Sequence, residues 1–132
     1  MFEVGVAATF EAAHTLRGDF GPAARLHGHT YRVEVMVRGT QLAADGTLVD
    51  LGLMRTAVDD VVAALHMREL EALEAFRDVN TTAERVAEHI AAAVTERLGA
   101  GVSAETLLAR VWESPQAWAA CERRLPAAAA AS

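Results

Sequence analysis

Residues 2–38 decide the fold, and they read FEVGVAATFEAAHTLRGDFGPAARLHGHTYRVEVMVR. Apolar side chains alternate with polar or small ones over residues 2–14, and again over residues 27–38. This period of two is typical of a β-strand with one buried face. The glycines and the proline in residues 15–26 predict a loop between the two runs. The stretch therefore predicts two strands that can pair with each other.

Three of the five histidines lie in this stretch. His27 and His29 share one face of the second strand, because side chains two residues apart in a strand point the same way. His14 falls on the apolar face of the first strand, so all three are expected on buried faces if no bulge shifts the alternation. Three converging imidazoles with an open fourth position are a common arrangement for a catalytic zinc. The alternative is three core or surface imidazoles with satisfied hydrogen bonds.

Two helices and two further strands are expected in the rest of the chain. Apolar residues recur at helical spacing over residues 52–66, and a segment without a clear period follows over about residues 68–80. Thr81 and Glu84 fit a capping box, which marks the start of a second helix. Strand character returns over residues 104–124, with a break at a Ser-Pro pair. The order β-β-α-α-β-β predicts an α+β fold with a four-stranded antiparallel sheet.

Size and composition narrow the class of protein. We expect one domain over residues 1–125 of the 132 and a disordered tail over residues 126–132. The net charge of −6 argues against nucleic-acid and anionic-membrane surfaces, which need clustered Lys and Arg. The single cysteine, Cys121, excludes an intrachain disulfide and fits a reducing compartment. No signal-peptide pattern or apolar run of about 20 residues is found, so a cytoplasmic protein is expected.

The chain contains five segments in this order: FEAAH at 10–14, LHGHTYRVEV at 26–35, LVDLGLMR at 48–55, NTTAERVAEHI at 80–90 and VWES at 111–114. In order and spacing they are similar to motifs of the 6-pyruvoyltetrahydropterin synthase and 6-carboxytetrahydropterin synthase family. The resemblance implies the T-fold, an antiparallel sheet with two helices on one face. It also implies trimers whose sheets close into a barrel, often stacked into hexamers, and a pterin-like small-molecule substrate bound at subunit interfaces. It further implies Zn²⁺ held by His14, His27 and His29.

The resemblance also implies substrate-binding residues. Glu113 matches a glutamate that anchors the pterin ring in the family. Its parity places it on an apolar face, where an unpaired carboxylate is costly and the guanidine-like edge of a pterin would offer paired donors. The alternative for Glu113 is a carboxylate paired within the protein. Thr81, Thr82 and Glu84 match a segment that contacts the pterin in related enzymes, although helix capping explains Thr81 and Glu84 as well.

The chain departs from the family at the residues that carry protons. Ala23 stands where the family has its catalytic cysteine, four residues before the H-G-H motif. His66 and Met67 stand where the family has an Asp-His pair. His66 is either a relocated acid or base, since it titrates near neutrality, or a surface residue at a helix end. Glu69 and Glu71 are interpreted as a solvated patch, with a role as base as the alternative.

Three functions are compatible with this pattern. The first is a zinc-dependent lyase or cyclase with an altered catalytic triad, acting on a pterin or a related carbonyl substrate in a biosynthetic pathway. The second is a non-catalytic homologue that binds a pterin or a metal. The third, a purely structural T-fold subunit, has no need of the three histidines and is the least favoured.

Overall fold

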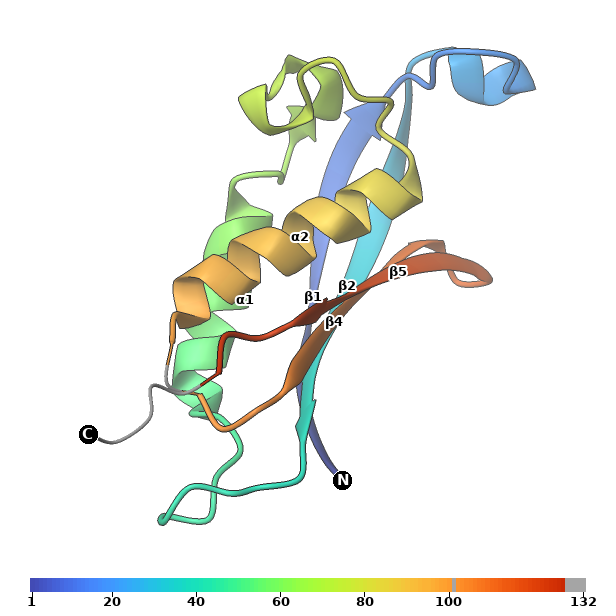
Figure 1. The fold of residues 1–132 in the computed structure, drawn as a ribbon. Coiled ribbons are helices and arrows are strands. Elements are labelled where there is room, and N and C mark those ends of the chain that lie inside the picture. The colour runs from blue at the N-terminus through green and yellow to red at the C-terminus, as the bar shows by residue number, and fades with distance from the viewer. Residues whose placement is uncertain (101, 128–132) are drawn as a thin grey trace.

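The computed structural model describes residues 1–100 and 102–127 and contains a five-stranded sheet (Figure 1). The strand order is β3-β1-β2-β4-β5, and every neighbouring pair is antiparallel except β3 and β1. Most of the expected tail, residues 128–132, lies outside the described residues. The strands are β1 (Phe2–His14), β2 (His27–Gly39), β3 (Arg68–Glu69), β4 (Thr106–Ser114) and β5 (Ala117–Arg124).

Two helices, α1 (Leu51–Ala63) and α2 (Ala83–Leu98), cover one face of this sheet (Figure 1). Three short 3₁₀ turns complete the fold, and they are η1 (Gly21–Ala24), η2 (Leu70–Ala72) and η3 (Glu74–Phe76). This layout confirms the expected α+β class with two helices on one face. No helix in the described ranges is both long and apolar enough to cross a membrane.

The core lies between the helices and the inner face of the sheet, where the predicted alternation is observed. Phe10 and Tyr31 face each other across β1 and β2, and their rings stack with centroids 4.8 Å apart. Val33, Val35 and Val37 are fully buried on the same face of β2. Burial of one such valine contributes about 1.5–3 kcal/mol, so this pattern fixes which face of the hairpin turns inward.

The sheet has five strands rather than the expected four, because the aperiodic segment adds β3. Arg68 and Glu69 pair in parallel with the end of β1. Just before them, the backbone N–H of Met67 donates to the carbonyl of Glu11, with Met67 in the left-handed region at φ 58°. The same segment also contains η2 and η3. Backbone hydrogen bonds form these contacts, and no periodic pattern of side chains in the sequence predicts them.

The first helix runs over residues 51–63 rather than the expected 52–66. Asp50 caps its start, since its carboxylate accepts from the backbone N–H groups of Gly52 and Leu53 at 2.8 and 3.3 Å. The helix pattern continues only as turn structure after Ala64. Leu65 nevertheless stays buried, which is why the apolar spacing extends past the last helical residue.

The expected capping box of the second helix is wrong by one residue. Thr82 is the N-cap of α2, and its hydroxyl accepts from the backbone N–H of Arg85 at 3.3 Å. Thr81 is fully buried and turns toward the histidines instead. The register of β4 with β5 is also irregular between Trp112 and Ser114, so strict alternation ends at Glu113.

Candidate metal centre

Strand register brings the three histidines together. In the β1–β2 ladder His14 lies opposite His27, and Ala12 lies opposite His29, so the three imidazoles share the inner face at one end of the hairpin. Each offers one ring nitrogen, and these three atoms lie within 4.8 Å of one another. The spacing H-x-H on one strand and a single histidine on its partner is therefore sufficient to build the cluster.

Backbone carbonyls orient two of the rings. The Nδ1 of His14 lies 2.7 Å from the carbonyl oxygen of Thr81, and the Nδ1 of His27 lies 2.7 Å from that of Arg25. A carbonyl oxygen can only accept, so each Nδ1 carries the proton and donates it. The Nε2 of each neutral ring then keeps its lone pair. Such a hydrogen bond on the far nitrogen is how proteins fix the tautomer of a metal-binding histidine.

The distance between two of these imidazoles suits a zinc ion. The Nε2 atoms of His14 and His29 lie 3.2 Å apart. Two nitrogens bound to zinc at about 2.0–2.1 Å with a tetrahedral angle are about 3.3 Å apart. Three neutral nitrogens would supply three of the four zinc ligands and leave one position open. A direct hydrogen bond between His14 and His29 is the alternative use of the same geometry.

Burial favours the neutral, metal-binding form of His29. His14 is only 1% exposed, and His27 and His29 are half-buried. Burial lowers the pKa of His29, and the neighbouring His14 and His27 lower it further, while Glu113 opposes this shift. A lowered pKa favours the neutral imidazole, which is the form that donates its lone pair.

Glu113 lies close enough to His29 to act on its pKa. Its carboxylate raises the pKa of His29 and contributes, after burial, to the raised pKa of Tyr31. The side chain is half-buried at the irregular end of β4. Thr81 also reaches the cluster through His14. Thr82 and Glu84 lie at the first turn of α2 and, within the described residues, make no hydrogen bond to the histidines.

His66 and Met67 lie at the edge of β1 rather than against the histidine rings. The Nδ1 of His66 accepts from the backbone N–H of Glu11 at 3.0 Å, and its side chain is exposed. Met67 is 74% exposed. Ala23 lies in η1, where its carbonyl accepts from Leu16 N–H at 3.0 Å. A hollow of about 430 Å³ adjoins this edge, lined by Glu11, Ala12, Ala13, Gly28, His29, Thr30, Met67, Arg68 and Glu69.

Comparison with known proteins identifies the family. The sequence profile of the 6-pyruvoyl tetrahydropterin synthase family matches residues 3–124 of the chain. The chain belongs to this family. A Pyrococcus horikoshii protein, named by inference as a 6-carboxy-5,6,7,8-tetrahydropterin synthase, is 26% identical in an alignment that covers 83% of this chain and 83% of that protein. The resemblance seen in the sequence is confirmed.

Solved structures of pterin synthases have the same fold. The Caenorhabditis elegans 6-pyruvoyl tetrahydropterin synthase superposes with a TM-score of 0.80 at 21% identity, over 92% of this chain and 95% of that one. A Plasmodium vivax 6-pyruvoyltetrahydropterin synthase, solved with a catalytic glutamate replaced by alanine, gives 0.77 at 18% identity, over 94% and 98%. The T-fold is therefore confirmed, and at these identities the structures support the fold alone.

For one residue near the site of this pterin synthase family member, Glu71, the prediction from the sequence is wrong. The interpretation of Glu71 as solvated is wrong: it is half-buried, and its Oε2 atom is buried without a hydrogen-bond partner in the described part of the chain. Its Oε1 accepts from the N–H of Thr15 at 2.6 Å and from the hydroxyl of Thr81 at 2.8 Å. Glu69 is exposed, as expected. The only available signal was the family motif, in which this position is an asparagine.

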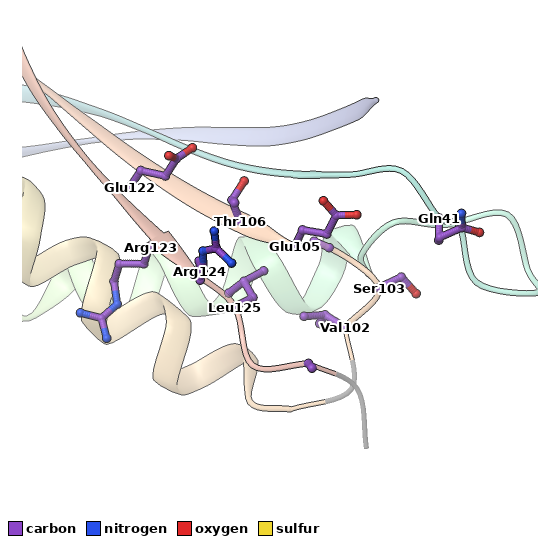
Figure 2. Close-up of a pocket in the computed structure, with 11 residues that line it drawn as sticks. Gln41, Val102, Ser103, Glu105, Thr106, Glu122, Arg123, Arg124 and Leu125 are labelled. Carbon is purple, nitrogen blue, oxygen red and sulfur yellow. The ribbon is translucent and has the colours of Figure 1, made fainter. Parts of the chain in front are cut away.

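A larger hollow lies at the opposite end of the sheet, where β4 begins and β5 ends (Figure 2). It has a volume of about 900 Å³, and Thr106 and Arg124 on its wall are paired across the two strands. The histidines instead lie where β1 ends and β2 begins. None of the residues that the sequence or the family motifs single out lines this larger hollow. The candidate site is therefore the histidine end of the sheet.

Proposed function

We propose that the chain is a zinc-dependent lyase or cyclase of the pterin-synthase type, acting on a pterin or a related carbonyl substrate in a biosynthetic pathway. The observation that carries this proposal is the convergence of His14, His27 and His29, with two far nitrogens held by carbonyl oxygens. Membership of the pterin synthase family supports the reaction class. A cytoplasmic location is part of the proposal.

The residues of the site have separate roles in this proposal. A bound Zn²⁺ supplies a Lewis acid that polarises the carbonyl or hydroxyl groups of the substrate. The three histidines hold the ion, and Glu113 accepts two N–H groups from the guanidine-like edge of the ring, as carboxylates do for such forks. Thr82 and Glu84 are proposed contacts at the start of α2. Thr81 is buried, so its contribution would come through His14.

Proton transfer is where this chain differs from the family motif. Ala23 and Met67 offer no titratable group. His66 is the proposed replacement, because its Nδ1 accepts from Glu11 N–H and leaves Nε2 to carry a proton. Glu69 is the second candidate, since it lines the hollow beside His29 and a Plasmodium vivax relative has a catalytic glutamate. Loss of a positioned base typically lowers rates by about 10²–10⁴, so turnover of dihydroneopterin triphosphate is expected to be weak.

A non-catalytic homologue that binds a pterin or a metal is the second candidate function. The absence of a thiol at Ala23 and of an imidazole at Met67 favours it. Incubation with dihydroneopterin triphosphate and related pterins, with mass spectrometry of the products, separates the two. Release of a new pterin supports the enzyme, and His66→Ala and Glu69→Gln then assign the proton carrier. Binding without any product supports the second function.

Zinc content tests the core of the proposal. Purified protein is expected to hold about one zinc per chain, and the double change His27→Ala with His29→Ala is expected to remove it. His66→Ala is the matched control, because this histidine does not share the cluster and should leave the zinc in place. Wild-type protein without zinc, or zinc that survives the double change, contradicts the metal site.

We further propose a homo-oligomer, a trimer or a hexamer, with sites at subunit interfaces. The outer edges of β5 and of most of β1 have no partner strand among the described residues, and such edges favour pairing with another chain. Trp118 is 52% exposed on β5, which suits an interface. Light scattering during size-exclusion chromatography distinguishes monomer, trimer and hexamer.

A further inference from the structure

A chain of hydrogen bonds connects Glu71 to the imidazole of His14. The Nδ1–H of His14 donates to the carbonyl oxygen of Thr81 at 2.7 Å. The hydroxyl of the same threonine donates to Oε1 of Glu71 at 2.8 Å. Thr81 is 0% exposed, so water does not compete for either bond. The carboxylate thus fixes the residue whose carbonyl sets the tautomer of His14.

The same carboxylate oxygen also fixes the backbone next to His14. The N–H of Thr15, the residue that follows the histidine, donates to Glu71 Oε1 at 2.6 Å. A second connection lies alongside: Asn80 accepts from the N–H of Arg17 at 2.8 Å and donates to its carbonyl at 3.0 Å. Hydrogen bonds therefore connect the end of β1 to the segment between α1 and α2 in two ways, through the backbone just after His14 and through the His14 ring.

We propose that Glu71 is a positioning residue for the metal ligand His14, acting through Thr81, an inference that rests on the proposed zinc function. Bonds to an ionised acceptor are roughly twice as strong as neutral ones, which gives a carboxylate an advantage over an amide at this position. Groups that hold metal-binding histidines in this way typically change metal affinity about 10–100-fold when they are removed.

Two variants of Glu71 separate positioning from general packing. Glu71→Gln keeps an oxygen that can accept from both Thr15 and Thr81, whereas Glu71→Ala removes both bonds. We expect zinc affinity, measured by competition with a chromophoric chelator, to fall about 10–100-fold in Glu71→Ala and much less in Glu71→Gln. Glu96→Ala is the matched control, because this exposed glutamate on α2 makes no hydrogen bond to Thr15 or Thr81 and should leave affinity unchanged.

A second readout needs no metal. The ¹⁵N chemical shifts of the His14 ring in metal-free protein should report a single Nδ1–H tautomer in the wild type and in Glu71→Gln, and a mixture in Glu71→Ala. If Glu71→Ala does not fold, Thr81→Val against Thr81→Ser makes the same comparison at the middle of the chain. If Glu71→Ala leaves the His14 tautomer unchanged and the zinc affinity within twofold of wild type, the role of Glu71 is overturned and the proposed zinc site is unaffected. Absence of zinc in the wild-type protein overturns the proposed function. The His14 tautomer in the variants is then the only measurement that tests the role of Glu71.

Discussion

The two regions that build the site follow different rules. The β1–β2 hairpin supplies His14, His27 and His29 through a regular ladder, so their positions follow from strand period and register. The segment between α1 and α2 supplies Thr81 and Glu71 from 3₁₀ turns and loops, beside the end of β1. The regular region decides which side chains meet, and the irregular region decides how one of them is oriented. The predictions below test whether these two contributions are separable.

Leu70→Ala gives the largest expected effect on the irregular segment. Leu70 is fully buried in η2, beside the carboxylate at position 71. Truncating a buried leucine costs about 2–5 kcal/mol of unfolding free energy, measured by urea denaturation. Ile90→Ala, a fully buried position on α2, is the matched comparison. A loss of unfolding free energy far below that of Ile90→Ala shows that the segment between α1 and α2 packs only weakly on the core. The division of the site into a regular and an irregular contribution is then wrong.

Tyr31→Phe tests the buried polar layer between the regions. The Tyr31 hydroxyl is buried and has no hydrogen-bond partner among the described residues. An unsatisfied buried hydroxyl costs free energy, so its removal is expected to raise the unfolding free energy of metal-free protein by about 1 kcal/mol. The stacking with Phe10 is retained. Lower stability in urea denaturation, instead of higher, means that the hydroxyl makes a hydrogen bond in the folded protein.

Met67→Gly sharpens the role of backbone geometry at the strand edge. Met67 has φ 58° and an exposed side chain, so glycine relieves strain with little loss of burial. The backbone N–H that bonds to Glu11 is kept. We expect stabilisation of about 0.5–1 kcal/mol by urea denaturation. Asp78→Gly, at φ 60° and also exposed, is the control for the same change away from the site. Destabilisation by Met67→Gly alone indicates a side-chain role for Met67.

His89 gives the smallest expected effect and lies on α2, where it packs against the irregular region but away from the histidine cluster. Burial lowers its pKa, and its ring lies 5.0 Å from that of Phe76. The unfolded chain, with a histidine pKa of about 6.5, then binds the proton more readily than the folded one as pH falls. Stability is therefore expected to decrease as pH falls through 6.5 and below. His89→Gln should reduce this slope in urea denaturation at pH 5 to 8, and an unchanged slope excludes His89 as its source.

The sequence predicts the regular parts of this protein well, for a physical reason. Alternation over β1 and β2 places His14, His27 and His29 on one face, and a burial pattern of period two has no second solution. The role of Glu113 as a substrate anchor stays a prediction, and the β4 alternation on which its placement relied breaks at that residue. The regular ladder thus carries its information in side-chain type and spacing, which a single sequence displays.

The irregular parts were predicted poorly for an equally physical reason. Glu71 was interpreted as solvated, because its partners are a backbone N–H and a hydroxyl distant in sequence, and neither leaves a periodic trace. Thr81 was assigned to helix capping because Thr82, next to it, has the same residue type. Strand β3 was missed because two residues are too short for any alternation. Side-chain to backbone bonds of this kind become visible only in three dimensions.

His14 and His27 form the last residue pair of the β1–β2 ladder, and this position has one further consequence. An ion bound there would cross-link the two ends of the connection formed by residues 15–26. Closing a loop in this way removes conformational entropy from the open chain, and the gain is largest where the ladder would otherwise fray. The histidines would then stabilise this end of the hairpin. Loss of the ion would free both the connection and the end of the inner face that carries the histidines.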